Sequence, residues 1–274
     1  MKVDLARDYG LRTTGARPHQ GGFASDCLVV DERWFVKIWG RDEPPARLGL
    51  LRELRAAGLP VPAPIPTTTG ELHAWCDGRP YAVFPFVEGR TARDDDWRLH
   101  ARALRRVHDV GGIDLPAMSM AEPQLHGLLD HPWLDGRRAE VEENLRRLRR
   151  AADRAGAKAV RHVLCHRDLH GLNLLVDDGQ IAAVLDWDQA VLGSREHDVW
   201  VAAEGTNGER FLTEYGARDL DLDHLEWALL SRALNDMAAR LHAGTDRPGV
   251  QTWGFRRIAK LDRDLEMFRP FCAC

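Results

Sequence analysis

The sequence predicts an α+β protein with a small lobe built on an antiparallel sheet, followed by a larger and mainly helical lobe. Before about residue 84, short apolar runs alternate with turn residues, which is typical of strands joined by hairpins. After about residue 90, long charged segments carry Leu, Val or Ala at helical spacing. The chain has 274 residues, of which 44% are hydrophobic, so it is long enough for two lobes with a sizeable core.

The first lobe is expected to contain strands and one helix. Strands are predicted for the apolar runs bounded by turn residues, at 27–30, 34–39, 72–76 and 81–86. A helix is predicted over 44–57, because leucines recur there at helical spacing, Pro45 suits an early helical position and Gly58 suits a stop. The proline-rich run at 59–66 must be extended, since each proline restricts the residue before it.

The second lobe is expected to be helical. Helices are predicted where charged faces alternate with apolar positions, at 94–110, 137–155, 222–241 and 256–267. The change of pattern places the first lobe at 1–83, a connecting segment at 84–89 and the second lobe at 90–274.

Charge and cysteine content restrict the partners. The formal net charge is −4, so the basic surface that a nucleic acid would require is absent, and a cationic small molecule is the better partner. The five cysteines do not form spaced zinc-binding pairs, and reduced thiols in a cytoplasmic protein are expected. No apolar stretch has the length of a membrane span or the pattern of a signal peptide, so neither membrane insertion nor export is expected.

The most informative segment is the loop after the apolar run at 163–165. The loop has the spacing His-x-Asp-x-x-x-x-Asn, with His166, Asp168 and Asn173 at the named positions. Asp186 follows the apolar residues Val184 and Leu185. This is the catalytic-loop pattern of kinases with the metal-binding aspartate that it requires. A phosphoryl-transfer site needs a carboxylate that orients the acceptor hydroxyl. It also needs oxygen ligands for Mg²⁺. The alternative interpretation is an ordinary hairpin with polar residues in its turn.

The neighbours of these residues have more limited roles. His166 is expected to hold the backbone of the loop, with Asp168 nearer the reacting hydroxyl. Asp188 lies two residues after Asp186, so on a continuing strand both carboxylates point to the same face. Asp186 is therefore the expected metal ligand, and Asp188 is expected beside the metal site or facing the substrate.

Lys37 is the expected phosphate contact in the first lobe. It lies in an otherwise apolar and aromatic strand, where an unpaired buried ammonium would be costly. A kinase lysine of this kind reaches the nucleotide phosphates and is held by a helix glutamate, for which Glu43 and Glu53 are both open choices. The alternative for Lys37 is the solvent face of an edge strand.

A glycine-containing turn at 20–26 could cover the phosphates. Gly22 would let backbone amides approach an anion, and Ser25 adds a hydroxyl. The turn lacks the full G-x-G-x-x-G pattern and would also suit a common hairpin. No G-x-x-x-x-G-K-[ST] sequence occurs, so a P-loop enzyme is not predicted.

The segment 196–226 is the most acidic part of the chain. Its carboxylates, Glu204 among them, could bind ammonium groups of a substrate, or they could form a solvated face. Asp198 opens a helix-like stretch in this segment and is expected to act as a cap.

These residues together resemble the aminoglycoside phosphotransferases, and most closely the spectinomycin phosphotransferases. The resemblance covers most of the chain. It rests on motifs in both lobes, at 20–22, 35–37, 81–87, 163–170, 185–188 and 195–198. It implies a protein-kinase-like two-lobe fold with a nucleotide-binding lobe at 1–83, a hinge at 84–89 and a catalytic and substrate-binding lobe at 90–274.

The resemblance also assigns roles. It implies that Asp168 is the catalytic base, that Asn173 and Asp186 bind Mg²⁺, and that Lys37 contacts the phosphates of ATP or GTP. The implied hinge residues, which would meet the adenine through backbone groups, are Phe84, Phe86 and Val87. The implied reaction is phosphorylation of an aminocyclitol or aminoglycoside hydroxyl, conferring antibiotic resistance.

Other functions remain open at this point. The acceptor could be a nucleoside or peptide antibiotic, or a small metabolite resembling choline or homoserine. A protein kinase is disfavoured, because only a dozen residues separate Asp186 from Asp198, which leaves no room for an activation segment. A non-catalytic pseudokinase is disfavoured because Lys37, Asp168 and Asn173 are all present. Both a monomer and a homodimer are compatible with the sequence.

Overall fold

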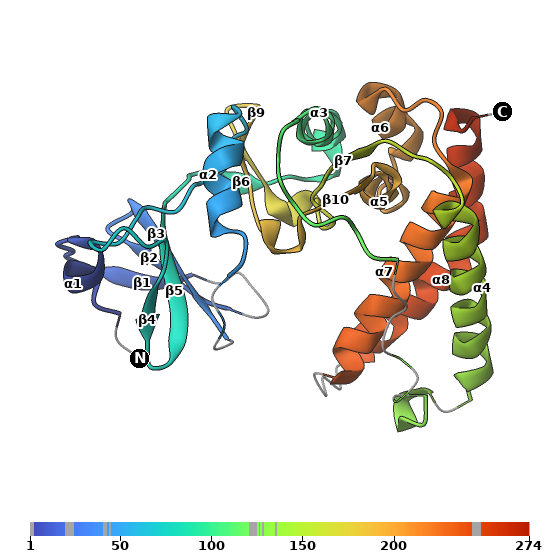
Figure 1. Cartoon of the computed structure of the whole chain (residues 1–274), viewed down its shortest axis with the longest axis horizontal. Helices are drawn as coiled ribbons and strands as arrows, with labels where there is room; N and C mark the ends of the chain where they lie inside the picture. Colours follow the sequence, from blue (N-terminus) through green and yellow to red (C-terminus); the bar gives the residue numbers. More distant parts are fainter. Residues whose placement is uncertain are drawn as a thin grey trace. The chain divides into compact units, whose positions relative to one another are not determined.

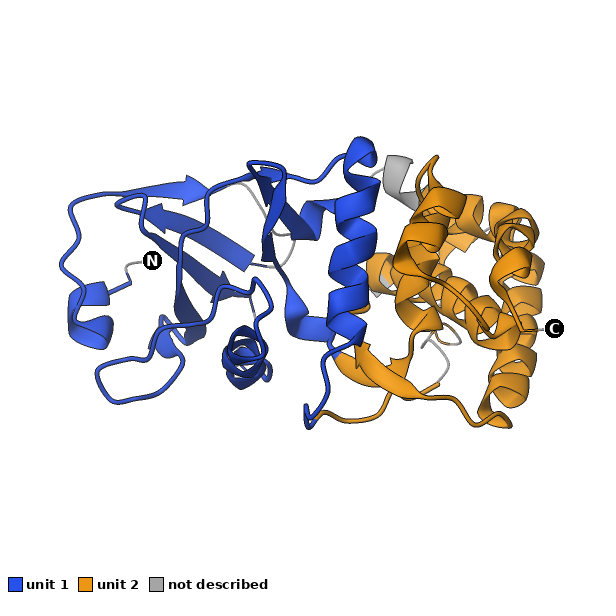
Figure 2. Cartoon of the chain, turned by 90° about the horizontal axis from the view of Figure 1, so that it is seen from above, with its two compact units in different colours: residues 1–114, 168–190 blue, residues 115–167, 191–274 orange. Residues whose placement is uncertain are grey.

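The computed structural model describes residues 3–19, 25–40, 43, 45–120, 125, 127, 129–134, 136–242 and 248–273, without the side chains of 242 and 248–252. Residues 20–24 of the predicted turn, with Gly22, lie outside these residues, and positions 25 and 26 are part of a strand. The chain divides into two compact units, residues 1–114 with 168–190 and residues 115–167 with 191–274 (Figure 2). In the parts described, no helix has the length and apolar character needed to cross a bilayer.

The first unit contains a five-stranded antiparallel sheet in the order β1-β2-β3-β5-β4 (Figure 1). Its strands are β1 (Ala16–His19), β2 (Ser25–Val30), β3 (Trp34–Trp39), β4 (Ala74–Cys76) and β5 (Arg79–Pro85). The hairpin between β4 and β5 turns at Asp77 and Gly78, which both have positive φ. Asp-Gly is the typical sequence for such a two-residue turn, and so β5 begins two residues earlier than predicted.

Side-chain alternation gives the two faces of this sheet different partners. Val36 and Ile38 pack with Leu5 and Tyr9 of α1 (Leu5–Tyr9) on one face. Trp39, Ala82 and Phe84 pack with Leu48 of α2 (Leu48–Ala56) on the other. Because successive strand residues point to opposite faces, Lys37 shares its face with Trp39.

The first unit also contains a smaller sheet, in the order β6-β8-β9. Its strands are β6 (Arg90–Thr91), β8 (Leu174–Asp177) and β9 (Gln180–Val184), and α3 (Trp97–His108) contacts β9. The 3-10 turns of this unit are η1 (Asp94–Asp96), η4 (Gly171–Asn173) and η5 (Trp187–Gln189). The compact unit therefore does not end at the predicted connection 84–89, because β6 pairs with β8 and joins the following residues to the unit.

The second unit is mainly helical. Its helices are α4 (Arg138–Gly156), α5 (Glu196–Val199), α6 (Gly208–Tyr215), α7 (Leu222–His242) and α8 (Pro248–Phe268). The short elements are η3 (Pro132–Leu134), η6 (Trp200–Ala203), η7 (Arg269–Phe271) and the strand pair β7 (His162–Cys165) with β10 (Val191–Ser194). Helix α8 begins eight residues before the predicted start of 256, because Pro248 is tolerated at the first helical position.

Candidate active site

The hairpin of β8 and β9 brings two predicted site residues to one end of the small sheet. Leu174 pairs with Val184, and the backbone N–H of Leu185 donates to the Asn173 carbonyl at 2.9 Å. Asn173 therefore precedes one strand and Asp186 follows the other, at adjacent ends of the hairpin. An amide oxygen and a carboxylate placed in this way are ligands that suit Mg²⁺.

Asp168 is held close to Asn173. The Asn173 Nδ2 donates to the Asp168 carbonyl at 2.8 Å and lies 3.5 Å from its Oδ2. Because the amide nitrogen is directed at the loop, the amide oxygen is the atom that can face a cation. The Asp168 side chain is 15% exposed, so it is shielded and still reachable by a small hydroxyl compound.

Gly171 allows the loop to lie close to the strand before α3. The Ala92 N–H donates to the Gly171 carbonyl at 3.1 Å, and a Cβ built on Gly171 would lie 2.8 Å from the Ala92 oxygen. A side chain at this position would push the loop away from its support. No motif in the sequence indicated this close approach.

Lys37 lies beside the aspartates at the end of β9. Its Nζ is 3.0 Å from Asp186 Oδ1 and 3.5 Å from Asp188 Oδ2. Burial by itself would lower the pKa of Lys37, but the Asp186 and Asp188 carboxylates outweigh it and raise that pKa above its ordinary value. Lys37 is therefore a permanent cation at this site and can attract phosphate oxygens.

The two glutamates proposed as partners of Lys37 are elsewhere. Glu43 and Glu53 are both exposed, and the ion-pair partners of Lys37 within the described residues are aspartates. The structure thus pairs Lys37 with Asp186 and Asp188 and does not bring either glutamate to it.

The predicted nucleotide contacts occupy different environments. Phe84 is buried in the sheet core, Val87 is half-buried after β5, and the Phe86 N–H donates to the Arg33 carbonyl at 2.8 Å. Ser25 is half-buried at the start of β2, where it pairs with Trp39. Their contacts with a nucleotide remain predictions.

Two residues of the site have an unusual backbone conformation. Arg167 and Asp186 have φ values of 68° and 60°, in the left-handed region that non-glycine residues rarely adopt. Such conformations cost energy and persist only where the surroundings hold them, which is common at functional sites.

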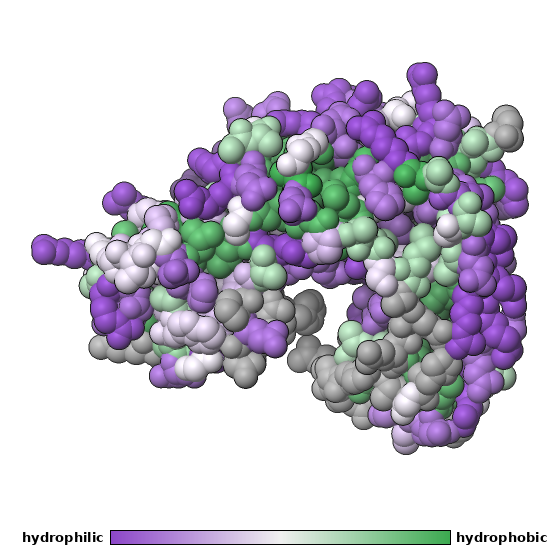
Figure 3. Space-filling model, in the orientation of Figure 1, coloured by the Kyte–Doolittle hydropathy of each residue, from purple (hydrophilic) through white to green (hydrophobic). Residues whose placement is uncertain are grey.

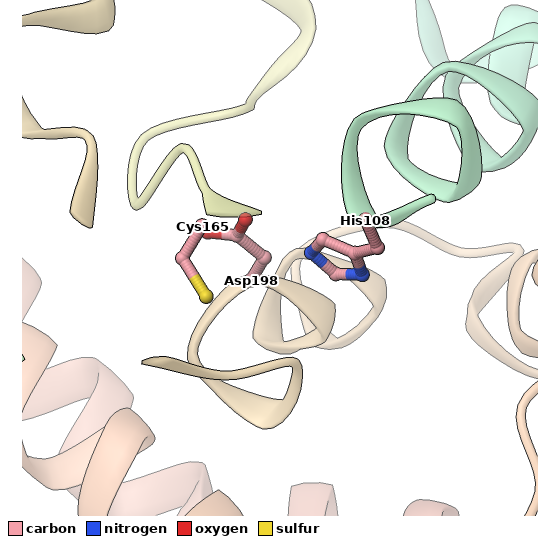
Figure 4. Close-up of side chains that lie close together, drawn as sticks. All are labelled: His108, Cys165 and Asp198. Atoms are coloured by element: carbon pink, nitrogen blue, oxygen red, sulfur yellow. The ribbon is translucent and has the colours of Figure 1, made fainter. Parts of the chain in front are cut away.

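Asp198 holds the first residues of the loop, His166 and Arg167. This role of Asp198 was not recognised in the sequence. Its carboxylate accepts the backbone N–H of His166 at 2.7 Å and of Arg167 at 2.6 Å. The predicted role as a helix cap is wrong, because Arg195 is the N-cap residue of α5 and Asp198 lies within the helix. Figure 4 shows Asp198 beside Cys165, at the end of β7. The apolar run 199–203 directly after Asp198 is the sequence signal that could have indicated that this carboxylate is buried.

Cys165 and His166, which lie beside Asp198, are both buried. His166 is fully buried, as a residue that supports the loop should be. Burial raises the pKa of the Cys165 thiol well above its ordinary value, and the nearby Asp198 raises it further. Cys165 therefore behaves as a neutral packing residue.

His197 introduces a dependence of stability on pH. Burial, together with the neighbouring His224, lowers its pKa from 6.5 to about 3. The unfolded chain binds the proton at a higher pH than the folded chain, so stability is complete above pH 6.5 and falls as the pH drops toward about 3. Between pH 7 and pH 4 we expect His197→Phe to remove roughly 3 kcal/mol of this pH-dependent loss. Urea unfolding of both proteins from pH 7 to pH 4 measures it, and parallel curves would contradict the assignment.

The acidic segment is largely engaged in ion pairs within the second unit. Arg154 pairs with Asp223 and Glu226 at 2.6 Å each, and Lys158 pairs with Asp221 and Asp223 at 2.6 Å each. These cations lie on or just after α4, whose hydrophilic surface is visible in Figure 3.

Glu204 is also engaged, because it pairs with Arg257. Of the two interpretations of this segment, structural charge pairing fits these residues better than an open ammonium site.

These features together define a kinase-like α+β protein with a lysine on a central strand and a loop-and-hairpin carboxylate site. Residues 15–251 match the family model described as the phosphotransferase enzyme family, and the chain belongs to this family.

A spectinomycin phosphotransferase solved in complex with ADP and spectinomycin has the same fold, with a TM-score of 0.67 and 19% identity over 98% of this chain and 93% of that one. A microcompartment-associated aminopropanol kinase is similar to the same degree, with a TM-score of 0.67 and 19% identity over 93% of this chain and 92% of that one.

Homoserine kinases are among the curated relatives of this chain. A homoserine kinase of Rhizobium rhizogenes is 30% identical over 170 residues, which are 58% of this chain and 52% of that protein. The chain thus matches about half the length of this relative. It matches 32% of the length of the homoserine kinase of Rhodospirillum rubrum.

Proposed function

We propose that this protein is a small-molecule kinase that transfers the terminal phosphoryl group of ATP or GTP to an acceptor hydroxyl. The observation that carries the proposal is the placement of Asp168, Asn173, Asp186 and Lys37 in one unit, with the contacts described above. Asn173 and Asp186 would hold Mg²⁺, which neutralises charge on the phosphates when bound.

The residues of the chain then act mainly by positioning. Asp168 orients the acceptor hydroxyl and takes its proton, as a new P–O bond forms to the acceptor and the bond to the leaving diphosphate breaks. Lys37, as a cation, attracts the phosphate oxygens. The products are a phosphate monoester and ADP or GDP.

The first candidate acceptor is an aminocyclitol or aminoglycoside, which would make the protein an antibiotic-resistance enzyme. The structural similarity to the spectinomycin phosphotransferase supports it. Such an acceptor carries several ammonium groups and calls for free carboxylates. At least six of the nine acidic residues in 196–226 are already bonded within the described residues, however: Glu196, Asp198, Glu204, Asp221, Asp223 and Glu226.

The second candidate acceptor is a small hydroxylated amino acid resembling homoserine. Arginines stand close to the chain just before Asp168: Arg232 Nη1 is 3.3 Å from the Arg167 carbonyl, and its guanidinium lies 4.9 Å from the centre of the Trp200 ring. Arg257 lies 5.0 Å from the same ring. Both guanidinium groups already pair with acidic residues, Arg232 with Asp236 and Arg257 with Glu204, so it is the curated relatives that favour the second candidate.

A panel of acceptors tests the proposal. The protein is incubated with MgATP and with homoserine, 3-aminopropanol, choline, spectinomycin, kanamycin or a nucleoside antibiotic, and the products are examined by mass spectrometry for one added phosphoryl group. We expect homoserine to be phosphorylated faster than 3-aminopropanol, which is the same skeleton without the carboxylate. Faster phosphorylation of spectinomycin or kanamycin would restore the antibiotic acceptor, and no product from any acceptor would contradict a small-molecule kinase.

A further inference from the structure

We infer that Asp188, held in place by Trp39, is the carboxylate partner of Lys37 when a metal–nucleotide complex occupies the site. The inference rests on the proposed function and adds two residues to it. Asp188 takes the role for which the sequence offered Glu43 or Glu53, and Trp39 is a positioning residue that acts through Asp188.

The contacts join Lys37, Trp39 and Asp188 into one cluster. Trp39 and Lys37 share a face of β3, and the Trp39 Nε1 donates to Asp188 Oδ2 at 3.2 Å. The Lys37 ammonium lies 3.5 Å from the same oxygen and 5.4 Å from the centre of the Trp39 ring. The indole therefore fixes the carboxylate by its N–H and favours the cation by its ring face.

The turn η5 keeps both aspartates on the side of Lys37. Trp187, between Asp186 and Asp188, is 2% exposed, and its Nε1 donates to the Val184 carbonyl at 3.0 Å. This buried anchor fixes the turn, so the carboxylates on either side of it cannot easily rotate away.

Metal binding changes which partner Lys37 can use. In the structure its shorter contact is to Asp186, at 3.0 Å against 3.5 Å for Asp188. Asp186 is also the residue placed to bind Mg²⁺, and oxygens committed to a metal are poorer acceptors for an ammonium. The Lys37 side chain is only 20% exposed, so besides the phosphate oxygens it needs a second carboxylate to replace Asp186 and hold it in place. Asp188 is that partner.

Binding of ADP with and without Mg²⁺ tests this role by calorimetry, independently of catalysis. We expect Asp188→Asn and Trp39→Phe each to raise the Kd of MgADP about tenfold, the scale found for residues that orient a metal site. Metal-free ADP should bind nearly as well as to the parent protein, because Asp186 then remains free to hold Lys37. The double variant should be no weaker than Asp188→Asn alone, since Trp39 acts through Asp188.

The controls separate this role from a general loss of structure. Trp75→Phe changes an indole that is 46% exposed on β4 and should leave both Kd values unchanged. Thermal unfolding of Trp39→Phe checks the packing of its buried ring. If that variant unfolds early, Asp188→Asn still decides the matter, because Asp188 is 36% exposed and outside the core.

Three results would overturn the inference. They are additive effects in the double variant, equal weakening of MgADP and metal-free ADP, and a weakening of MgADP by Glu53→Gln. Each of these leaves the proposed function intact, provided that the parent protein binds MgADP. Failure of the parent protein to bind MgADP would overturn both.

Discussion

Replacement of Asp168 by asparagine should lower kcat by about 10²–10⁴-fold, the usual contribution of a positioned general base. Asparagine keeps the shape of the side chain but cannot accept the proton of the acceptor hydroxyl. The Asn173 Nδ2 donates mainly to the Asp168 carbonyl, at 2.8 Å, and this backbone contact is unaffected by the substitution. The loop should therefore stay in place while the chemical step slows.

Steady-state kinetics with the best acceptor and calorimetric binding of MgADP check this expectation together. Asp178→Asn is the matched control, because Asp178 is exposed in the β8–β9 turn with a φ of 44°, a conformation that asparagine tolerates. If Asp168→Asn retained most of the parent kcat, a different residue would have to accept the proton.

Replacement of Asp198 by alanine should destabilise the fold by roughly 2–6 kcal/mol, from 1–3 kcal/mol for each buried donor left without an acceptor. The two donors are the backbone N–H groups of His166 and Arg167, and Asp198 itself is 2% exposed. The loop would lose the contact that holds the left-handed conformation of Arg167, so phosphotransfer should also fall.

Urea unfolding monitored by circular dichroism measures the loss of stability. Asp198→Asn keeps one oxygen acceptor and should lie between alanine and the parent protein. Glu209→Ala is a control for the loss of an acidic side chain, since Glu209 is exposed on α6 and surface changes are usually within about 0.5 kcal/mol. An Asp198→Ala protein as stable as the parent would show that the two N–H groups find other acceptors.

The local pattern of the chain predicted most of the secondary structure, because strands and helices have different hydrophobic periods. The helix observed as α4 and the strand observed as β3 lie where Leu and Val spacing placed them. The boundaries of α8 and β5 differed, because a proline can begin a helix and an Asp-Gly pair can make a two-residue turn. Periodicity alone does not decide such ends.

The sequence alone determined the family, which the match over residues 15–251 confirms. It also predicted the residues of a phosphotransfer site, because the spacing from His166 to Asn173 and the later Asp186 meet the chemical requirements of a kinase loop. Tertiary structure decided which charges are free. It paired Lys37 with Asp186 and Asp188 instead of a glutamate, joined Trp39 to Asp188, and placed Asp198 under the loop. It also engaged most of the acidic segment in ion pairs. These contacts join residues far apart in the chain, and electrostatic energy depends on distance and burial, which residue order does not contain.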